Sequence, residues 1–211
     1  MRLPEIPSEA FKEILEELRR RPVEMNKYRK ESGDGRSQAW GIVNRRCLPP
    51  DYSRQCWKRP YLYKLLLEFG EKYIPFPFTS VTVNQSYQAA AHRDKSNLGE
   101  SFLVAFGSYE GGELEILEGC QKGVYDIKNK PIVEDFSLML HQVKPFTGER
   151  FSLVFYTFFN PRWVLDVPPP SVREENGIWV FYRGEERVDM DRGLDHPLLG
   201  FKHSSFEVGF E

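Results

Sequence analysis

The sequence predicts a mainly β chain with helices near its N-terminus (α+β), built around a jelly roll. Short segments with period-two alternation follow one another between residues 80 and 158. Turn residues separate these segments, most clearly Glu110-Gly111-Gly112-Glu113. Helical periodicity is seen in two segments before residue 77. Many short strands with almost no helix between them are typical of antiparallel sandwiches and barrels.

Composition indicates one folded domain with an extension. The chain has 211 residues, 14% of them aromatic, and a net charge of -2 that argues neither for nor against a nucleic-acid partner. Three cysteines, Cys47, Cys56 and Cys120, form neither a CxxC pair nor an even set, which favours thiols in a reducing compartment. No apolar run approaches the ~20 residues of a membrane span, and no secretory signal is apparent. We therefore expect an intracellular protein, cytoplasmic or nuclear, that does not bind a membrane.

Two helices are expected in the N-terminal part. The first starts at Ser8, carries an apolar face and stops at Pro22; its apolar positions are Phe11, Ile14, Leu15 and Leu18. The second opens at Pro60 and has Gly70 near its end. We expect the first of them to pack against the back of a sheet.

A basic segment with interleaved aromatic residues runs from Arg19 to Lys64. Such a segment can bind phosphates and stack bases, but it can equally be a solvated region that balances the acidic remainder of the chain. If it binds phosphates, the candidate residues are Arg36, Arg45, Arg46 and Lys58.

The pattern changes to period two after residue 77. The expected strands are Ser80–Tyr87, Ser101–Phe106, Glu113–Leu117, Gly123–Ile127, Phe136–Leu140, Arg150–Phe158 and, in the tail, Ile178–Tyr182. Pro168-Pro169-Pro170 forms a stiff spacer before the tail. We expect residues 1–77 to be a helical and basic segment that packs on a β core of residues 78–160. A C-terminal extension of residues 161–211 completes a single domain.

Two histidines and one carboxylate form a candidate metal site. Residues two apart on a strand point to the same side, so His92 and Asp94 can reach one ion together. His141 follows an apolar segment on what we expect to be a later strand. Two histidines and a carboxylate on one face of Fe(II) leave positions for a 2-oxo acid and O₂, as in non-haem iron oxygenases.

Arg150 and Ser152 complete the pattern. The distal carboxylate of 2-oxoglutarate needs a cation, and a guanidinium pairs with it through two hydrogen bonds. Ser152 lies two residues on, on the same face of the same expected strand, where it can add a hydroxyl. A turn between His141 and Arg150 predicts that metal and carboxylate anchor lie side by side on adjacent strands.

Other interpretations of these residues are less favoured. A histidine in an apolar strand is more often a core residue than a ligand, and an HxD pair alone is common by chance. His92-Arg93-Asp94 looks like the kinase HRD motif, but the position where kinases need asparagine is Gly99. A three-histidine cupin lacks its extra histidine near Asp94. The conjunction of HxD, a later histidine and RxS favours an iron oxygenase.

The chain resembles the Fe(II)/2-oxoglutarate-dependent dioxygenases over residues 78–158, about the length of their double-stranded β-helix core. The resemblance is carried by four stretches: 83–87 (VNQSY), 92–101 (HRDKSNLGES), 107–114 (GSYEGGEL) and 145–154 (PFTGERFSLV). They are similar to an algal, viral and phage branch related to the TET and J-binding-protein oxygenases, which oxidise methyl groups of pyrimidines in DNA.

The resemblance implies an enzyme that uses Fe(II), 2-oxoglutarate and O₂, with ascorbate as a reductant. It implies His92, Asp94 and His141 as iron ligands. It implies Arg150 and Ser152 for 2-oxoglutarate, and suggests that Asn84 contacts this co-substrate or orients its neighbours. Asn97 lies in the loop after the metal pair, where substrate specificity is often set.

Three functions remain open from sequence. The first is oxidation of a C–H bond on a nucleobase methyl group in DNA or another nucleic acid, with the base flipped or single-stranded. The second is hydroxylation of a peptidyl residue or a small metabolite, in which case the basic segment is a lid. The third is a non-catalytic jelly-roll binding module. The intact set of polar residues disfavours this last function, and the sequence predicts no oligomeric state.

Overall fold

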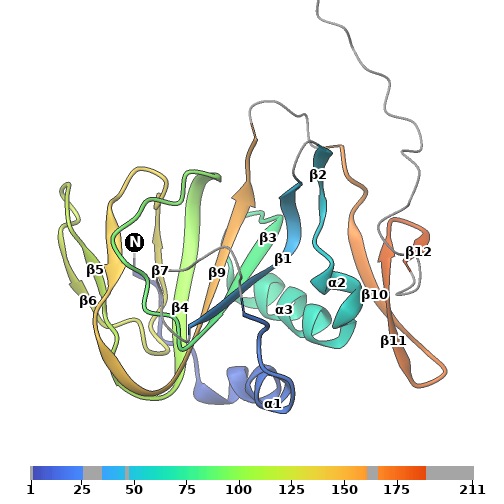
Figure 1. Cartoon of the computed structure of the whole chain (residues 1–211), viewed down its shortest axis with the longest axis horizontal. Coiled ribbons are helices and arrows are strands. Elements are labelled where there is room, and N and C mark those ends of the chain that lie inside the picture. The colour runs from blue at the N-terminus through green and yellow to red at the C-terminus, as the bar shows by residue number, and fades with distance from the viewer. Residues whose placement is uncertain (1, 26–34, 46–47, 161–165, 189–211) are drawn as a thin grey trace, which may run out of the picture.

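The computed structural model describes residues 2–25, 35–45, 48–160 and 166–188, drawn in colour in Figure 1. Its N-terminal elements are η1 (Ser8–Phe11), α1 (Lys12–Arg20), β1 (Arg36–Arg45), β2 (Leu48–Tyr52), α2 (Gln55–Lys58) and α3 (Pro60–Tyr73). The strands that follow are β3 (Ser80–Gln85), β4 (Asn97–Gly111), β5 (Leu114–Ile116), β6 (Gly123–Tyr125), β7 (Ile132–Glu134), β8 (His141–Val143) and β9 (Phe146–Phe158). A C-terminal group holds β10 (Pro170–Glu175), β11 (Ile178–Arg183) and β12 (Glu186–Val188).

The strands form three sheets. The main sheet has the order β2-β1-β3-β9-β4-β7, the minor sheet the order β6-β5-β8, and the C-terminal sheet the order β10-β11-β12. All strand pairs within these sheets are antiparallel. The long strands β4 and β9 pair from Gly111 opposite Phe146 to Asn97 opposite Phe158. The mainly β architecture with a jelly-roll core and a few helices confirms the predicted fold class.

The two faces of the main sheet have different roles, and β9 shows why. Its apolar residues Phe151, Leu153 and Phe155 are fully buried in the core on the helix side. The alternate residues, among them Arg150 and Ser152, line a cavity on the other side. Side chains alternate between faces with a period of two, so one strand supplies both a core and a site.

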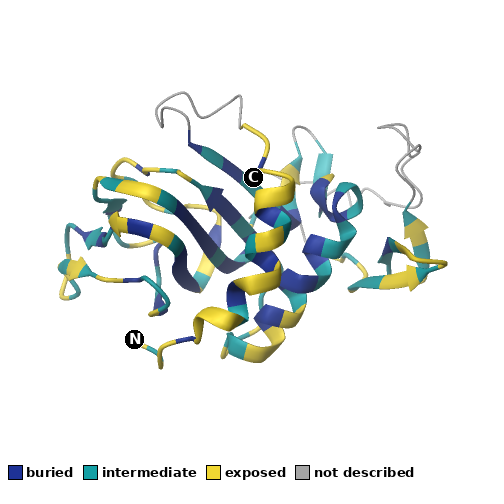
Figure 2. Ribbon diagram, turned by 90° about the horizontal axis from the view of Figure 1, so that it is seen from below, coloured by how far each residue is buried: buried dark blue, intermediate teal, exposed yellow. Residues whose placement is uncertain are grey.

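Both predicted helices are present and cover one face of the main sheet (Figure 2). Phe11, just before α1, stacks on Phe106 of β4 with ring centroids 4.6 Å apart. Phe69 of α3 stacks on Phe155 of β9 at 5.8 Å. Such aromatic pairs contribute about 0.5–1.5 kcal/mol beyond the area they bury. They fix the helices to the back of the sheet and leave its other face for the cavity.

The C-terminal sheet packs on α2, α3 and the edge strand β2. Phe181 of β11 is 1% exposed and contacts the rings of Tyr52, Trp57 and Tyr63. The hydroxyl of Tyr52 donates a hydrogen bond to the carbonyl of Pro168 at 2.8 Å. The expected tail strand is present as β11 and is one residue longer than predicted.

Two expectations about strands need correction. Residues 136–140 do not form a strand: residues 136–138 are a turn, in which the carboxylate of Asp135 accepts a hydrogen bond from the amide of Ser137 at 3.0 Å. The N-terminal segment also contains β1 and β2, which extend the main sheet beyond β3. Gly41 in β1 has a φ of +88°, and a Cβ there would lie 2.1 Å from the carbonyl oxygen of Thr79. Only glycine permits this approach, and it interrupts the regular alternation by which β1 could have been recognised.

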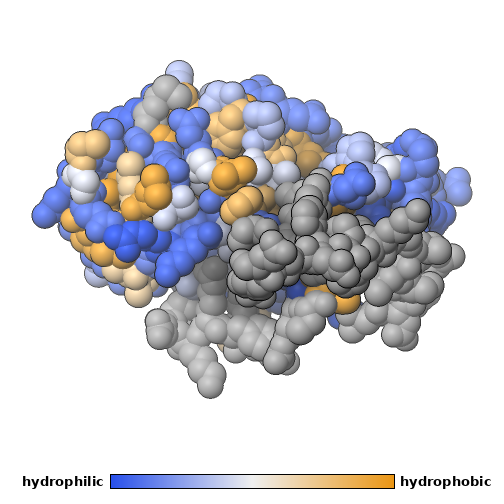
Figure 3. Space-filling model, turned by 90° about the horizontal axis from the view of Figure 1, so that it is seen from above, coloured by the Kyte–Doolittle hydropathy of each residue, from blue (hydrophilic) through white to orange (hydrophobic). Residues whose placement is uncertain are grey.

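The face seen in Figure 3 carries hydrophobic side chains in separate small patches among hydrophilic ones. Within the described part of the chain, no helix combines the length and the apolar character needed to cross a membrane.

Candidate active site

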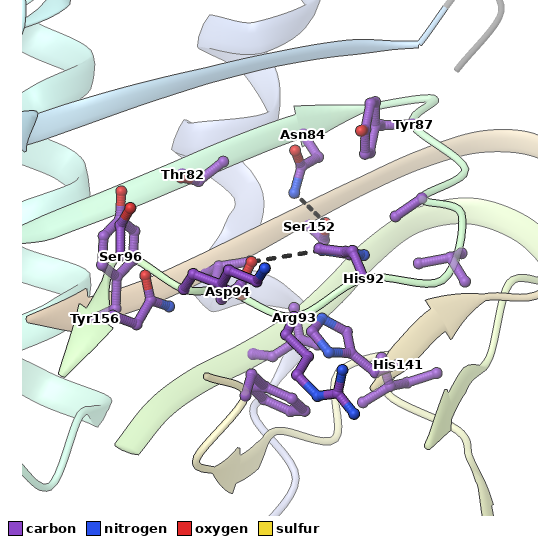
Figure 4. Close-up of a pocket in the computed structure, with 18 of the residues that line it drawn as sticks. Thr82, Asn84, Tyr87, His92, Arg93, Asp94, Ser96, His141, Ser152 and Tyr156 are labelled. Carbon is purple, nitrogen blue, oxygen red and sulfur yellow. Dashed lines mark hydrogen bonds and ion pairs between the residues drawn. The ribbon is translucent and has the colours of Figure 1, made fainter. Parts of the chain in front are cut away.

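A cavity of about 430 Å³ opens on the face of the main sheet that the helices leave free. Strands β3 and β9 line one side of it, and β8 and the loop after β3 line another (Figure 4). Seven residues predicted from sequence line this cavity: Asn84, His92, Asp94, Asn97, His141, Arg150 and Ser152. The fold therefore brings the two halves of the predicted site together from positions up to 68 residues apart, as with Asn84 and Ser152.

The side chains of His92, Asp94 and His141 converge. One ligand atom from each lies within 4.8 Å of the other two, a spacing that could hold a single metal ion. Nε2 of His92 is 3.5 Å from Oδ1 of Asp94. The two imidazole centroids are 4.3 Å apart.

The HxD pair does not lie on a regular strand, contrary to the prediction. It sits in the loop after β3, where His92 forms an isolated antiparallel bridge with His141. The amide of His92 donates to the carbonyl of His141 at 2.9 Å, and the amide of His141 donates back at 3.0 Å. The amide of Asp94 donates to the carbonyl of Phe136 at 2.9 Å. The loop is thus held against the segment that carries the third residue of the triad.

Both histidines are held in one tautomer. Nδ1 of His92 is 2.8 Å from the carbonyl of Ala90, and Nδ1 of His141 is 2.9 Å from the carbonyl of Met139. A carbonyl accepts only, so each Nδ1 must carry the proton and each Nε2 keeps its lone pair for a metal. Burial lowers the pKa of His141, with the Met139 carbonyl and Asp94 acting in the opposite direction. The neutral form is the one that binds metal.

Arg93 connects the loop that carries His92 and Asp94 with the segment before His141. It points away from His92 and Asp94 in Figure 4 and donates from Nε to the carbonyl of Leu138 at 3.1 Å. Its guanidinium also pairs with Glu118, whose carboxylate accepts the amide of Leu140 at 3.0 Å. These contacts hold the residues just before His141.

Arg150 is the most deeply buried cation among the described residues, at 1% exposure. Its Nε and Nη2 have no hydrogen-bond partner among the described residues. The guanidinium lies between the rings of Tyr109 and Phe146, 5.5 and 5.4 Å from their centroids. Burial lowers the pKa of Arg150, while Tyr109 raises it. Leaving buried donors unpaired costs about 1–3 kcal/mol each, so the geometry fits an anion that accepts from them.

Ser152 and Asn84 extend this polar wall. They lie opposite each other in the β3–β9 pair, and Nδ2 of Asn84 donates to Oγ of Ser152 at 3.1 Å (Figure 4). Oδ1 of Asn84 is buried without a hydrogen-bond partner among the described residues. The structure therefore supports an orienting contact from Asn84 to Ser152.

The anchor and the triad do not lie on adjacent strands, contrary to the prediction. His141 begins β8 in the minor sheet, whereas Arg150 lies on β9 in the main sheet. Both sheets line the cavity, so the minor sheet supplies His141 of the triad and the main sheet supplies Arg150.

The other predicted substrate residues are placed less favourably. Arg45 pairs with Asp51 at 3.0 Å, and Lys58 pairs with Glu24 at 3.3 Å. Arg36 donates to the carbonyl of Val23 at 3.1 Å. Asn97 lines the cavity but donates to Oγ of Ser101 at 3.0 Å. Arg46 lies outside the described residues.

Sequence reasoning missed several residues around Arg150. Tyr109 and Phe146 enclose its guanidinium, and Gly112 lies against its side chain. No local sequence pattern predicts such contacts, because they form between different strands. Thr82 also lines the cavity, and the sequence offered a signal for it. Thr82 is a polar residue between the buried Val81 and Val83, and it lies two residues before Asn84, so both side chains point to the same face of β3.

Comparison with solved structures identifies the fold. NgTET1 in complex with 5mC DNA aligns with a TM-score of 0.51 and 15% identity, over 74% of this chain and 71% of that one. The likeness shows a shared fold. The convergence of His92, Asp94 and His141 agrees with the triad that the sequence resemblance implies for the Fe(II)/2-oxoglutarate-dependent dioxygenases.

Two other oxygenase-fold structures are also similar. A prolyl-4-hydroxylase from Pseudomonas putida aligns at a TM-score of 0.48 with 15% identity, over 75% of this chain and 92% of that one. A 2OG-Fe(II) oxygenase family oxidoreductase from Burkholderia pseudomallei aligns at 0.46 with 16% identity, over 74% and 82%. No protein-family model and no curated protein matches the sequence.

Proposed function

We propose that the protein is an Fe(II)- and 2-oxoglutarate-dependent dioxygenase that hydroxylates a C–H bond. One observation carries the proposal: a buried guanidinium, two of whose nitrogens have no hydrogen-bond partner among the described residues, lines the same cavity as a convergent His-Asp-His triad. A fold alone does not specify an activity, but this pair of features matches the two ligands that the reaction needs.

His92, Asp94 and His141 would hold the iron. When bound, the iron supplies the activation of O₂ that is coupled to conversion of 2-oxoglutarate to succinate and CO₂, with one oxygen atom inserted into the substrate C–H bond. The carbonyls of Ala90 and Met139 fix both imidazoles in the tautomer that carries its proton on Nδ1 and its lone pair on Nε2. Asp94 contributes the negative charge beside them. The carbonyl partners orient the ligands before metal arrives.

Arg150 would bind the distal carboxylate of 2-oxoglutarate. Its Nε and Nη2 can donate to two carboxylate oxygens at once, and the hydroxyl of Ser152, on the same face of β9, can add a third hydrogen bond. The rings of Tyr109 and Phe146 shield the guanidinium from water. A charge-assisted pair is stronger in such a low-dielectric site than at the surface.

For the substrate we propose a nucleobase methyl group. NgTET1, which shares the fold, is described in complex with 5mC DNA. At the cavity the exposed Lys95 can contact a phosphate. Because Arg45 and Lys58 are engaged in ion pairs, Lys95 is the better candidate for a phosphate contact than the residues predicted from sequence.

The test is succinate formation with Fe(II), ascorbate and 2-oxoglutarate. Methylated single- and double-stranded oligonucleotides, peptides and metabolites are offered in parallel, and products are weighed by mass spectrometry. We expect a methylated oligonucleotide to stimulate turnover and to gain the mass of one oxygen atom. Lys95→Gln should weaken this stimulation and its dependence on salt.

Two results separate the alternatives. Stimulation by a peptide or metabolite, with no effect of any oligonucleotide, contradicts the nucleobase substrate but leaves the dioxygenase intact. Failure to bind Fe(II) and 2-oxoglutarate together contradicts the enzyme itself and favours a binding module.

A further inference from the structure

A second hollow lies on the helix side of the main sheet, away from the candidate active site. It has a volume of about 570 Å³ and is bounded by the end of α1, the start of α3 and the tip of the β10–β11 hairpin. Figure 2 shows α1 and α3 on this side of the sheet. The volume is within the range of about 300–1,000 Å³ that is usual for small-molecule sites.

The groove carries an excess of positive charge. Arg20, Arg21 and Arg59 line it together with one carboxylate, Glu17, so its formal charge is three minus one, or +2. Glu17 is already paired with Arg20. The groove thus offers more cationic donors than its own acid can neutralise.

Arg59 is the buried member of this set. It is 7% exposed, and its Nη2 donates to the carbonyl of Glu17 at 3.0 Å. Burial lowers its pKa to about 10, with Arg21 acting in the same direction and Glu17 and Glu24 in the opposite one. A guanidinium held beside a like charge in a partly desolvated site gains most from an anion that enters the groove.

The start of α3 adds to the same potential. This helix runs for 14 residues from Pro60, and no side chain caps its first turn. Pro60, Tyr61 and Leu62 all line the groove. The positive end of the helix dipole favours an anion there, in addition to the three arginines.

Aromatic and apolar residues also line the groove, and Nζ of Lys64 lies 5.3 Å from the centroid of the Trp179 ring. Tyr61 and Trp179 pack with ring centroids 5.3 Å apart and an interplanar angle of 31°. Ile178, next to Trp179 at the hairpin tip, is 66% exposed. These aromatic and apolar residues suit a planar ring rather than a bare inorganic ion.

We propose that the groove binds a small ligand of the nucleotide class, with its phosphate on Arg20, Arg21 and Arg59 and its ring against Trp179 and Ile178. This site is separate from the oxygenase cavity and lies on the opposite face of the main sheet. It gives a role to part of the basic, aromatic segment that the catalytic site leaves unused.

The experiment titrates the full chain with AMP, adenosine and inorganic phosphate, followed by calorimetry and tryptophan fluorescence. We expect AMP to bind more tightly than either of its parts. Arg21→Gln should weaken AMP binding about 10-fold or more, the effect of losing one charge-assisted hydrogen bond. Trp179→Leu should weaken binding and abolish the fluorescence change. Arg54→Gln removes an exposed arginine outside the groove and should leave the affinity unchanged.

Three further measurements make the outcome decisive. Saturating 2-oxoglutarate should not displace AMP, and Arg21→Gln should form succinate at the parental rate. Equal affinity for AMP and phosphate would overturn the nucleotide assignment. So would binding of a single-stranded oligonucleotide or an acidic peptide without binding of AMP, because the groove would then be a surface for a macromolecule. Unchanged AMP affinity in both groove variants would place AMP elsewhere and reject the site.

Discussion

Gly112 leaves the space that the side chain of Arg150 occupies: a Cβ at position 112 would lie 2.8 Å from Nε and 2.9 Å from Cδ of Arg150. We expect Gly112→Ala to raise the KM for 2-oxoglutarate several-fold, because the guanidinium must move. The φ of +71° at Gly112 adds a backbone cost of about 1–2 kcal/mol in unfolding free energy.

Gly119→Ala is the matched control for Gly112→Ala. Its φ is +79°, but a Cβ there meets no atom of the described part of the chain within 4 Å. It should lose similar stability in denaturant unfolding and keep the parental KM. Equal KM values for both variants would show that Gly112 does not position Arg150.

Replacement of Arg150 should separate co-substrate binding from metal binding. Arg150→Lys keeps a charge but cannot form the two-fold contact, so we expect the KM for 2-oxoglutarate to rise about 10–100-fold, the effect of losing charge-assisted hydrogen bonds worth ~1.5–3 kcal/mol. Metal affinity, measured by titration with Co(II), should remain near the parental value. A parental KM in Arg150→Lys would place the distal carboxylate elsewhere in the cavity.

Metal and 2-oxoglutarate should stabilise the fold together. Without O₂, Fe(II) at about 100 times its Kd should add ~2.7 kcal/mol to the free energy of unfolding. For a chain of this size that corresponds to a Tm increase of about 5–10 °C. A chelator should reverse the shift, and Asp94→Ala should abolish it. If 2-oxoglutarate raises the Tm of the metal-free protein as much as that of the loaded protein, the co-substrate does not bind next to the metal.

Glu118 should influence metal affinity without contacting the metal. Its carboxylate receives the Leu140 amide and pairs with Arg93, so Glu118→Ala releases the segment before His141. We expect about a 10-fold loss of Co(II) affinity, as for other groups that orient ligands. The change in stability should be small because the ion pair is partly exposed.

Two variants test that interpretation of Glu118. Glu118→Gln keeps an acceptor for the Leu140 amide and should recover most of the metal affinity. Glu68→Ala removes a comparable exposed pair, with Lys64 on α3, and should not change metal affinity. A parental Co(II) affinity in Glu118→Ala would mean that the loop holds its shape without this contact.

The sequence by itself determined the fold class and the two main helices, and it predicted the residues of the candidate site. These depend on local signals: period-two alternation in β3 and β9, the helix start at Pro60, and residue types that suit iron and a carboxylate. The spacing of Arg150 and Ser152 placed both on one face because a regular strand has a fixed period.

Only the tertiary structure decided how the pieces meet. His92 and Asp94 lie in an irregular loop, whose side-chain directions no period describes, and their place is set by hydrogen bonds to His141 and Phe136. Contacts between segments far apart in the chain also enclose Arg150 between Tyr109 and Phe146. Similar contacts bring α1, α3 and the β10–β11 hairpin together around Arg59. Such contacts form from packing of the whole core, which local residue patterns do not encode.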